Sequence, residues 1–521
     1  MVQIGDILEL TITETGMNGE GVARHDGLVL FVPLTLVGEI VRVQVKEVKK
    51  NFAVARVIKL LHPSPERVEP ACPIFYRCGG CEMQHIVYSA HGAIKQRMVQ
   101  DCMRKAGLDC TVDTTVCLPP ALGYRNKAQV PFGMQGDRVV VGYFRPGTHD
   151  VVPFGQMSDG SIGCPLHDGQ INTIVETVRR VVEQLHIPVY SETTHSGIMR
   201  HVVVRRVGQA YAVVLVVNAP SFRQIPPFVQ ALQDAGIDFS LYVSPHCKRT
   251  NVIVGDVVKC VHGNDPMTQT VLGVQCAVSP KSFMQINDAV RDAIYLRMRD
   301  TVAQFARALV LDAYSGTGIT SNLIAPVARK VVAIEIVPDA VRDADEMARR
   351  NGNTDKIRNI CGDCRVELPR VIAQMGGKYR VADTLQVEHS DFMRLSEQEG
   401  TLALADDKTI ERGQVLRLQD QESGKYLDVR VQHARDAQGN VTVAPIDTPI
   451  LLLDPPRKGC DPSVMQAIAQ AAPQAIVYVS CNPATLARDL QSLTDYHIRS
   501  VTPYDMFPQT RHVETVAVLA R

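Results

Sequence analysis

The chain lacks a net charge and lacks any apolar run long enough to cross a membrane. Its 521 residues include 55 Lys and Arg against 55 Asp and Glu, and none of its apolar runs approaches the ~18 residues that a membrane span needs. The N-terminus also lacks a basic segment followed by an apolar core, which is the pattern of a secretory signal. With 45% hydrophobic residues, the composition is that of a globular protein, which we expect to be cytoplasmic and without a membrane partner.

Zero net charge conceals a local imbalance. Residues 381–447 contain 13 acidic and 7 basic residues, so the rest of the chain carries a net charge of +6, too small an excess to identify a nucleic-acid-binding protein. The same stretch breaks a regular pattern, because about ninety residues separate Asp363 from Asp454 where one strand–helix step needs roughly thirty. Since its apolar residues alternate as in strands, we interpret residues 381–446 as an acidic, β-rich insert.

The insert is expected to avoid RNA. Its negative charge repels phosphates, so we expect its body to project away and either to screen off competing RNAs or to contact a protein partner. Asp363 and Asp454 flank it, and both are expected on the ligand side of the domain. We therefore expect the root of the insert to lie near the ligand pocket.

Three domains are predicted around this insert. Residues 1–62 read as short strands separated by turns, which suits a small OB-like β-barrel. Residues 63–275 form a middle domain with a cysteine cluster and a sheet. Residues 276–521 contain apolar runs without alternation, typical of buried parallel strands, so the fold class is multidomain α/β with a doubly wound C-terminal domain.

Fourteen cysteines in such a chain favour metal binding or catalysis over disulfide bonds. Cys72, Cys78 and Cys81 have the spacing C-x5-C-x2-C, and Cys164, between a glycine and a proline, is a natural fourth ligand. Four thiolates suit zinc or an iron–sulfur cluster, and the spacing leaves the choice between them open.

A nucleoside-binding pattern begins at Asp312 and continues to Gly318. Two glycines after a buried strand let the backbone approach a ligand, and Glu335 ends the next strand, where an acid can accept ribose hydroxyls. Asp363 follows the third strand, near where an adenine would lie. The loop lacks the Lys-Ser/Thr of a P-loop, which argues against a nucleoside triphosphate. Asp454 opens a proline-rigidified loop after the fourth strand and can orient either ligand.

Cys481 is the candidate nucleophile. It follows the apolar strand Ala475 to Ser480 and precedes a predicted helix, whose N-terminus is expected to lower the pKa of the thiol. Glu514 follows about thirty residues later inside a second apolar run and is the candidate general base. One thiol to attack and one carboxylate to take a proton are what covalent catalysis on a weakly nucleophilic carbon requires.

These segments together resemble the RNA uracil-5-methyltransferase family over nearly the whole chain except the insert. The matching motifs are Cys72-Pro73 with Cys78-Gly79-Gly80-Cys81, Ser282 to Asn287, Asp312 to Gly318, Asp454 to Gly459, Ser480 to Leu490, Asp505 to Thr510, and His512-Val513-Glu514. The phrases Gly19 to Ala23, Phe31 to Pro33 and Gly38-Glu39 resemble a TRAM domain, an RNA-binding barrel.

The resemblance implies a fold, an activity and a set of site residues. The C-terminal domain would be a Rossmann-like class I methyltransferase that moves a methyl group from S-adenosylmethionine to C5 of a uridine in RNA. Cys481 would add to C6 of the base, and Glu514 would remove the C5 proton. The S-adenosylmethionine site would contain Gln285, Tyr314, Glu335, Asp363 and Asp454, and a [4Fe-4S] cluster would be held by Cys72, Cys78, Cys81 and Cys164.

The RNA substrate is expected to be 23S rRNA, because the TRAM-like barrel and the cluster together resemble the ribosomal branch. A 5-methyluridine methyltransferase of the tRNA T-loop is the alternative, and a non-catalytic RNA-binding assembly factor is a further one. A radical methylthiotransferase is disfavoured, because that class needs C-x3-C-x2-C. Five basic residues of the middle domain are expected to contact RNA: Arg125, Lys127, Arg200, His201 and Arg205.

Overall fold

The N-terminal unit is a six-stranded sheet with strand order β1-β5-β6-β4-β3-β2. The computed structural model describes residues 2–16, 19–374, 379–404, 410–436 and 438–521. Leu30, Val32 and Val43 belong to a core that this unit does not share with the rest of the chain. Its strands are β1 (Ile7–Thr11), β2 (Glu14–Thr15), β3 (Gly21–His25), β4 (Leu28–Val32), β5 (Ile40–Val48) and β6 (Phe52–His62).

The middle domain is a seven-stranded sheet covered by helices α2 and α3. Its strand order is β15-β14-β13-β12-β7-β8-β9. The elements are β7 (Lys127–Gln135), β8 (Arg138–Phe144), β9 (Val151–Pro153), β10 (Gly155–Gln156), β11 (Ile162–Gly163), α2 (Gly169–Gln184), β12 (Met199–Val207), β13 (Ala210–Val217), α3 (Pro226–Asp234), β14 (Phe239–Pro245) and β15 (Lys259–His262), with a separate hairpin of β16 (Met267–Val271) and β17 (Val274–Val278).

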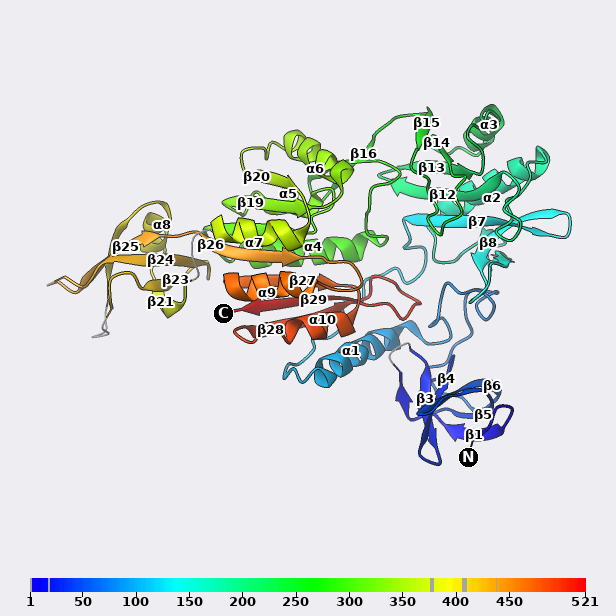
Figure 1. The fold of residues 1–521 in the computed structure, drawn as a ribbon, viewed down its shortest axis with the longest axis horizontal. Coiled ribbons are helices and arrows are strands. Elements are labelled where there is room, and N and C mark those ends of the chain that lie inside the picture. The colour runs from blue at the N-terminus through cyan, green and yellow to red at the C-terminus, as the bar shows by residue number, and fades with distance from the viewer. Residues whose placement is uncertain (1, 17–18, 375–378, 405–409, 437) are drawn as a thin grey trace.

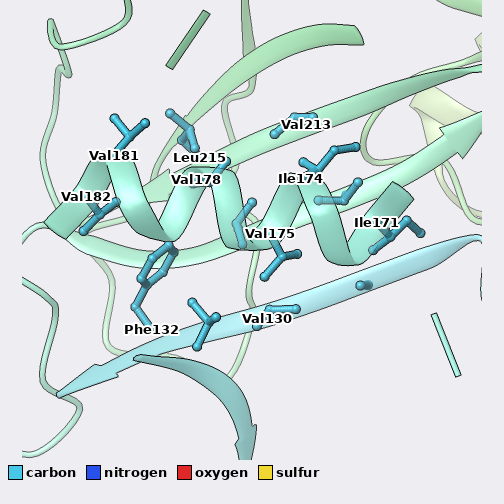
Figure 2. Packing of buried hydrophobic residues seen from close by; sticks show 14 of the residues in the cluster. Val130, Phe132, Ile171, Ile174, Val175, Val178, Val181, Val182, Val213 and Leu215 are labelled. Atoms are coloured by element: carbon cyan, nitrogen blue, oxygen red, sulfur yellow. The ribbon is translucent and has the colours of Figure 1, made fainter. Parts of the chain in front are cut away.

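Helix α2 shows why this sequence packs on a sheet. The Asp168 side chain accepts a hydrogen bond from the amide of Gln170 and so caps the helix. Apolar residues recur every three or four positions from Ile171 to Val182, which puts them on one helical face. Figure 2 shows that face against the sheet, where Val130 and Leu215 meet it.

The C-terminal domain is a second seven-stranded sheet, ordered β20-β19-β18-β26-β27-β29-β28, in which β29 runs antiparallel to β27 and β28. Its elements are α4 (Asp288–Val302), β18 (Ala308–Ala313), α5 (Ile319–Ile324), β19 (Lys330–Glu335), α6 (Pro338–Arg350), β20 (Ile357–Cys361), α7 (Cys364–Gln374), β26 (Thr448–Leu453), α9 (Pro462–Ala471), β27 (Ala475–Ser480), α10 (Pro483–Leu490), β28 (His497–Tyr504) and β29 (Glu514–Ala520).

The continuous apolar runs of these strands are explained by burial on both faces. Leu451 and Leu453 of β26 pack into one core, while Ile450 and Leu452 of the same strand pack into the core on the opposite face. A strand covered on both sides has no solvent face and therefore no alternation. Helix α1 (Tyr88–Lys105) lies on this domain, packed against α10 and β28.

In its described residues, the acidic insert is a five-stranded sheet with one helix, and its strand order is β21-β23-β24-β25-β22. It has a hydrophobic core of its own and lies at one end of the molecule, while the middle domain lies at the other (Figure 1). The elements are β21 (Val381–Val387), α8 (His389–Glu397), β22 (Gly400–Ala403), β23 (Val415–Asp420), β24 (Tyr426–His433) and β25 (Asn440–Pro445).

The expectation that the insert is rooted near the ligand pocket is wrong. The insert leaves the domain after α7 and returns at Thr448, the first residue of β26. It therefore replaces a helix-to-strand connection, and these connections lie at the amino ends of parallel strands. Asp363 and Asp454 follow the carboxyl ends of β20 and β26, so one helix and one strand separate them from the insert.

Among the described residues, no helix is both long enough and apolar enough to cross a bilayer.

Candidate active site

A cavity of about 740 Å³ lies beyond the carboxyl ends of the C-terminal sheet. Every residue predicted for catalysis or cofactor binding lines it, although these residues come from loops up to 229 positions apart in the chain. Topology explains the convergence, because the loops that follow parallel strands meet at one edge of the sheet. The predicted residues that line the cavity are Gln285, Tyr314, Glu335, Asp363, Asp454, Cys481 and Glu514.

The glycine loop and Glu335 form one wall. The amide of Gly316 donates to one carboxylate oxygen of Glu335 at 3.0 Å, and the amide of Val337 donates to the other at 2.9 Å. Tyr314, Gly316 and Gly318 all have positive φ, so the loop turns sharply away from β18. A Cβ on Gly318 would lie 3.0 Å from the Cβ of Ala344, which explains glycine there. The carboxylate is thus fixed where a ribose can reach it.

The lining of the cavity also contains a residue that sequence reasoning did not assign. Phe283 lines the cavity with 74% of its surface exposed, two residues before Gln285. Asn126 of the middle domain donates to the backbone carbonyl of Gln285 at 3.1 Å and so holds this segment against the sheet of another domain. A large aromatic side chain left exposed at a cavity mouth is suited to stacking on a planar ligand. The sequence could have indicated this residue, because Phe283 lies inside the family motif Ser282 to Asn287.

Cys481 and Glu514 are neighbours across the β27–β29 ladder. Ser480 is the register partner of Thr515, which brings the next residue, Cys481, beside Glu514. Asn482 caps α10 through the amide of Ala484 at 3.1 Å, and its own amide donates to the carbonyl of Arg457. The nucleophile candidate is therefore held between a strand end, a capped helix and the loop of Arg457.

The electrostatics differ from the expectation for Cys481. Burial raises the pKa of the Cys481 thiol, and Glu514 and Asp454 raise it further, while Arg457 opposes them. The expectation that the helix N-terminus lowers this pKa is wrong, because desolvation and neighbouring carboxylates outweigh it. A reactive thiolate then needs either a higher pH or a substrate that changes its surroundings.

The carboxyl groups are also shifted upward. Burial, followed by the nearby Asp454, raises the pKa of Glu514 well above its usual range. Burial raises the pKa of Asp312 to about 6. Desolvation in the cavity wall, followed by the nearby Asp312, raises the pKa of Asp454. A carboxylate with a raised pKa holds a proton more strongly, which is the property of a general base.

A second cavity, of about 270 Å³, lies in the middle domain, and the four predicted cluster ligands line it: Cys72, Cys78, Cys81 and Cys164. None of the four is in a disulfide bond. The amide of Gly80 donates to the Cys78 sulfur at 3.4 Å, and Gln84 donates to the Cys81 sulfur at 3.2 Å. Burial raises the pKa of Cys164 to about 12. Among the described residues, no group of three or more His, Cys, Asp or Glu side chains is arranged to hold a metal ion.

Of the five basic residues expected to contact RNA, three are buried on β12: Arg200, His201 and Arg205. Arg200 donates to the carbonyls of His246 and Lys248, and burial lowers the pKa of His201 to about 4. Burial makes these three unsuited to contact RNA, and a charged residue in a strand shows in sequence no sign of which face it occupies. Arg125 is partly exposed and lines the cysteine cavity, so its contact with RNA stays a prediction.

Known proteins resemble this chain over its whole length. Residues 403–521 match the family described as tRNA (Uracil-5-)-methyltransferase, and residues 2–58 match the TRAM domain. An uncharacterised RNA methyltransferase of Halalkalibacterium halodurans is 31% identical over 99% of this chain and 98% of its own. One of Bacillus cereus is 30% identical over the same shares. The crystal structure of Pyrococcus abyssi tRNA (uracil-54, C5)-methyltransferase with S-adenosyl-L-homocysteine has the same fold, with a TM-score of 0.66, 22% identity, and 98% and 99% of the two chains covered.

Proposed function

Because the chain belongs to the RNA uracil-5-methyltransferase family, and so is an S-adenosylmethionine-dependent RNA (uracil-C5)-methyltransferase, we propose that it methylates 23S rRNA through a covalent adduct with Cys481. The observation that carries the mechanism is the pairing of Cys481 with Glu514 in one cavity with the glycine loop. This pair also disfavours a non-catalytic assembly factor, which would not need a nucleophile beside a base.

The chemistry follows from the weakness of uracil C5 as a nucleophile. The Cys481 thiolate adds to C6, and the enolate formed makes C5 able to attack the methyl group of S-adenosylmethionine. The methyl–sulfur bond breaks, and S-adenosylhomocysteine leaves. Glu514 then takes the C5 proton, the C6–sulfur bond breaks, and the thiolate is restored. The target base must leave its stack to reach Cys481, and Phe283 at the cavity mouth is placed to support it.

The methyl donor occupies the wall built around the glycine loop. Glu335 accepts the ribose hydroxyls, Asp363 lies at the adenine end, and Tyr314 and Gln285 complete the site. Asp454 lies between this wall and Cys481, where a carboxylate stabilises a positively charged sulfonium. Five carboxyl groups and three basic side chains line the cavity, an excess of acidic groups that suits a cationic donor.

The four cysteines would hold a [4Fe-4S] cluster. They line one cavity, and N–H groups donate to two of the sulfurs, as around cluster thiolates. Four converging sulfurs are the ligand set that such a cluster uses, and its positive irons would stabilise the deprotonated form of the thiols. The cluster would tie the segment of Cys72, Cys78 and Cys81 to Cys164.

Lys127 is the proposed RNA contact. It is partly exposed and is the register partner of Arg205 across β7 and β12. Arg205 is 3% exposed, as buried as Arg200, and donates weakly to the carbonyl of Ser279, four residues before Phe283, so it is not proposed to touch RNA. A cation in the position of Lys127 suits a phosphate of the RNA near the target base.

The ribosomal substrate is supported by the TRAM domain together with the cysteine cavity. The tRNA alternative is favoured by the Pyrococcus abyssi fold neighbour, which covers 98% of this chain, so the domain plan alone does not separate the two. Labelled S-adenosylmethionine, incubated with unmodified 23S rRNA and with unmodified tRNA in parallel, should label the 23S rRNA. Mapping should place the label at one or more uridines. Label in tRNA alone would overturn the ribosomal assignment.

A further inference from the structure

A lysine outside the cavity has all three of its ammonium protons directed at one catalytic loop. Lys95, in the middle of α1, is 0% exposed. Its Nζ donates to Oδ1 of Asp505 at 2.5 Å, to the carbonyl of Phe507 at 3.2 Å and to the carbonyl of His512 at 2.7 Å. Burying an ammonium is unfavourable unless every proton finds an acceptor, and here each one does.

The three acceptors lie at the two ends of a loop that leads into the active site. The loop connects β28 to β29 and contains Phe507, which lines the cavity. His512 is two residues before Glu514, so a shift of its carbonyl moves the first residue of β29. A single nitrogen atom therefore joins the start and the end of the segment that presents Phe507 and Glu514.

The loop is held by contacts from outside in addition to its own turn, in which Thr510 donates to the carbonyl of Phe507. Gln509 has a φ of 68°, a conformation that a residue with a side chain rarely adopts. Its carbonyl accepts hydrogen bonds from the amides of Glu82 and Met83, next to the cysteine cavity. Tyr124 donates to the carbonyl of Pro508 at 3.0 Å. A strained loop with external partners persists only while those partners hold it.

We propose that Lys95 is a positioning residue for proton removal, which holds the Asp505–His512 loop so that Glu514 reaches C5 of the methylated base. This inference rests on the proposed role of Glu514. Lys95 itself lies outside the cavity and touches neither substrate. Its loss should slow the step that uses Glu514 and spare the step that uses Cys481, because Cys481 lies between β27 and α10 and not on this loop.

The alternative is that Lys95 only neutralises Asp505, which is also fully buried. Lys95→Met alone leaves a buried carboxylate without a cation and is expected to destabilise the protein severely. The informative comparison is between Asp505→Asn and the double variant Lys95→Met/Asp505→Asn. Both lack the carboxylate, and they differ only in the ammonium that reaches the carbonyls of Phe507 and His512.

Each variant is measured for melting temperature, for binding of RNA and S-adenosylmethionine, for turnover, and for covalent adduct on uridine-containing RNA in denaturing gels. Asp505→Asn should turn over within about threefold of the wild type, whereas the double variant should lose about 100-fold in kcat with little change in KM. The double variant should also accumulate the methylated adduct. Turnover of the folded double variant equal to that of Asp505→Asn would overturn the inference.

Three further variants complete the test. Lys105→Met, exposed at the end of the same helix, should behave as wild type. Should the methionine double variant fail to fold, Lys95→Gln/Asp505→Asn keeps a polar group without the ammonium, and the same fall in kcat is expected. Glu514→Gln tests the role of Glu514 separately. If this variant does not accumulate the adduct, the proposed mechanism is wrong. If it does accumulate the adduct while the Lys95 variants turn over normally, only the role of Lys95 is wrong.

Discussion

The two ends of the C-terminal sheet each carry a cleft of similar size but of different lining. The cleft at the carboxyl ends measures about 740 Å³ and is lined by five carboxyl groups, a thiol and an exposed phenyl ring. The cleft at the amino ends, between the sheet and the insert, measures about 700 Å³ and is lined by four arginines and one carboxyl group, that of Asp383, among neutral side chains. Size therefore does not identify the active site, and the lining does.

The different linings of the two clefts follow from the connections of a parallel sheet. Loops after the strands converge on one edge and can bring distant residues together, so chemistry gathers there. Loops before the strands can grow without disturbing that edge, and the insert uses one of them. Its junction is built for packing: Arg417 is buried against the carboxylate of Asp428 and beside Gln474. An arginine engaged in this way is not available for RNA phosphates.

The strongest test of the comparison removes the nucleophile at the carboxyl end. Cys481→Ala should lower methylation by at least about 1,000-fold, because without addition at C6 the C5 carbon remains unreactive. The wild type should form a lasting adduct with 5-fluorouridine RNA, since fluorine cannot leave as a proton does. Cys247→Ala, at an exposed cysteine of the middle domain, serves as the control. An adduct trapped by Cys481→Ala would mean that another residue is the nucleophile.

Removing the base should have the next largest effect. Glu514→Gln should still form the adduct but resolve it about 100-fold more slowly, because only the proton transfer is lost. The raised pKa of Glu514 and of Cys481 means that both groups ionise above their usual pH. Wild-type kcat/KM should therefore rise with pH across the neutral range. Full turnover by Glu514→Gln would remove this residue from the mechanism.

The segment that follows the cysteine cavity contacts the loop at the carboxyl end of the C-terminal sheet, because the amides of Glu82 and Met83 donate to the carbonyl of Gln509. Removing the cluster therefore tests whether the carboxyl end depends on the middle domain. Anaerobically purified protein should be brown and contain iron and sulfide. Cys78→Ser should lose the iron and lower the melting temperature by about 5–10 °C, since the cluster closes a loop between Cys81 and Cys164. Cys247→Ser should keep the metal. A colourless protein with stoichiometric zinc would show that the metal assignment is wrong.

A buried carboxyl at the carboxyl end should also make stability depend on pH. The pKa of Asp312 rises from 3.8 to about 6 on folding, so its contribution is present below pH 4 and is lost as the pH rises through 6. The loss is at most about 3 kcal/mol. Asp312→Asn should therefore melt at a higher temperature relative to wild type at pH 8 than at pH 4. Asp300→Asn, on the exposed side of α4, should show no such change.

What the sequence predicted, and what it did not, divides along physical lines. The positions of Glu335, Asp363, Asp454 and Cys481 follow from strand ends, which the apolar runs mark. Glu514 follows from an apolar run that contains a carboxylate.

Properties set by tertiary contacts were not predicted. The direction of the Cys481 pKa depends on Glu514 and Asp454, which meet it only in the fold. The three acceptors of Lys95 lie more than 400 residues away in sequence. The sequence does not show where the insert is rooted. Asp363 and Asp454 flank it, but α7 lies between Asp363 and the insert, and β26 lies between the insert and Asp454. The local sequence pattern therefore predicts which residues belong to the site. Their pKa values and the contacts that hold them in place depend on long-range packing.

The smallest catalytic effect is expected at the amino end. Replacing residues 381–446 with a short Gly/Ser linker removes an acidic lobe whose root is a full strand length from Cys481. Binding of S-adenosylmethionine and methylation of a minimal RNA should stay within about threefold of wild type, since no described cavity residue belongs to the insert. The melting temperature should fall, because Phe305 loses its packing partner Tyr426. We propose that the lobe contacts a protein and keeps competing RNAs away, so methylation of non-target uridines should increase. The contrary result is weaker RNA binding with a flatter dependence on salt, which would mean that basic residues of the insert touch phosphates.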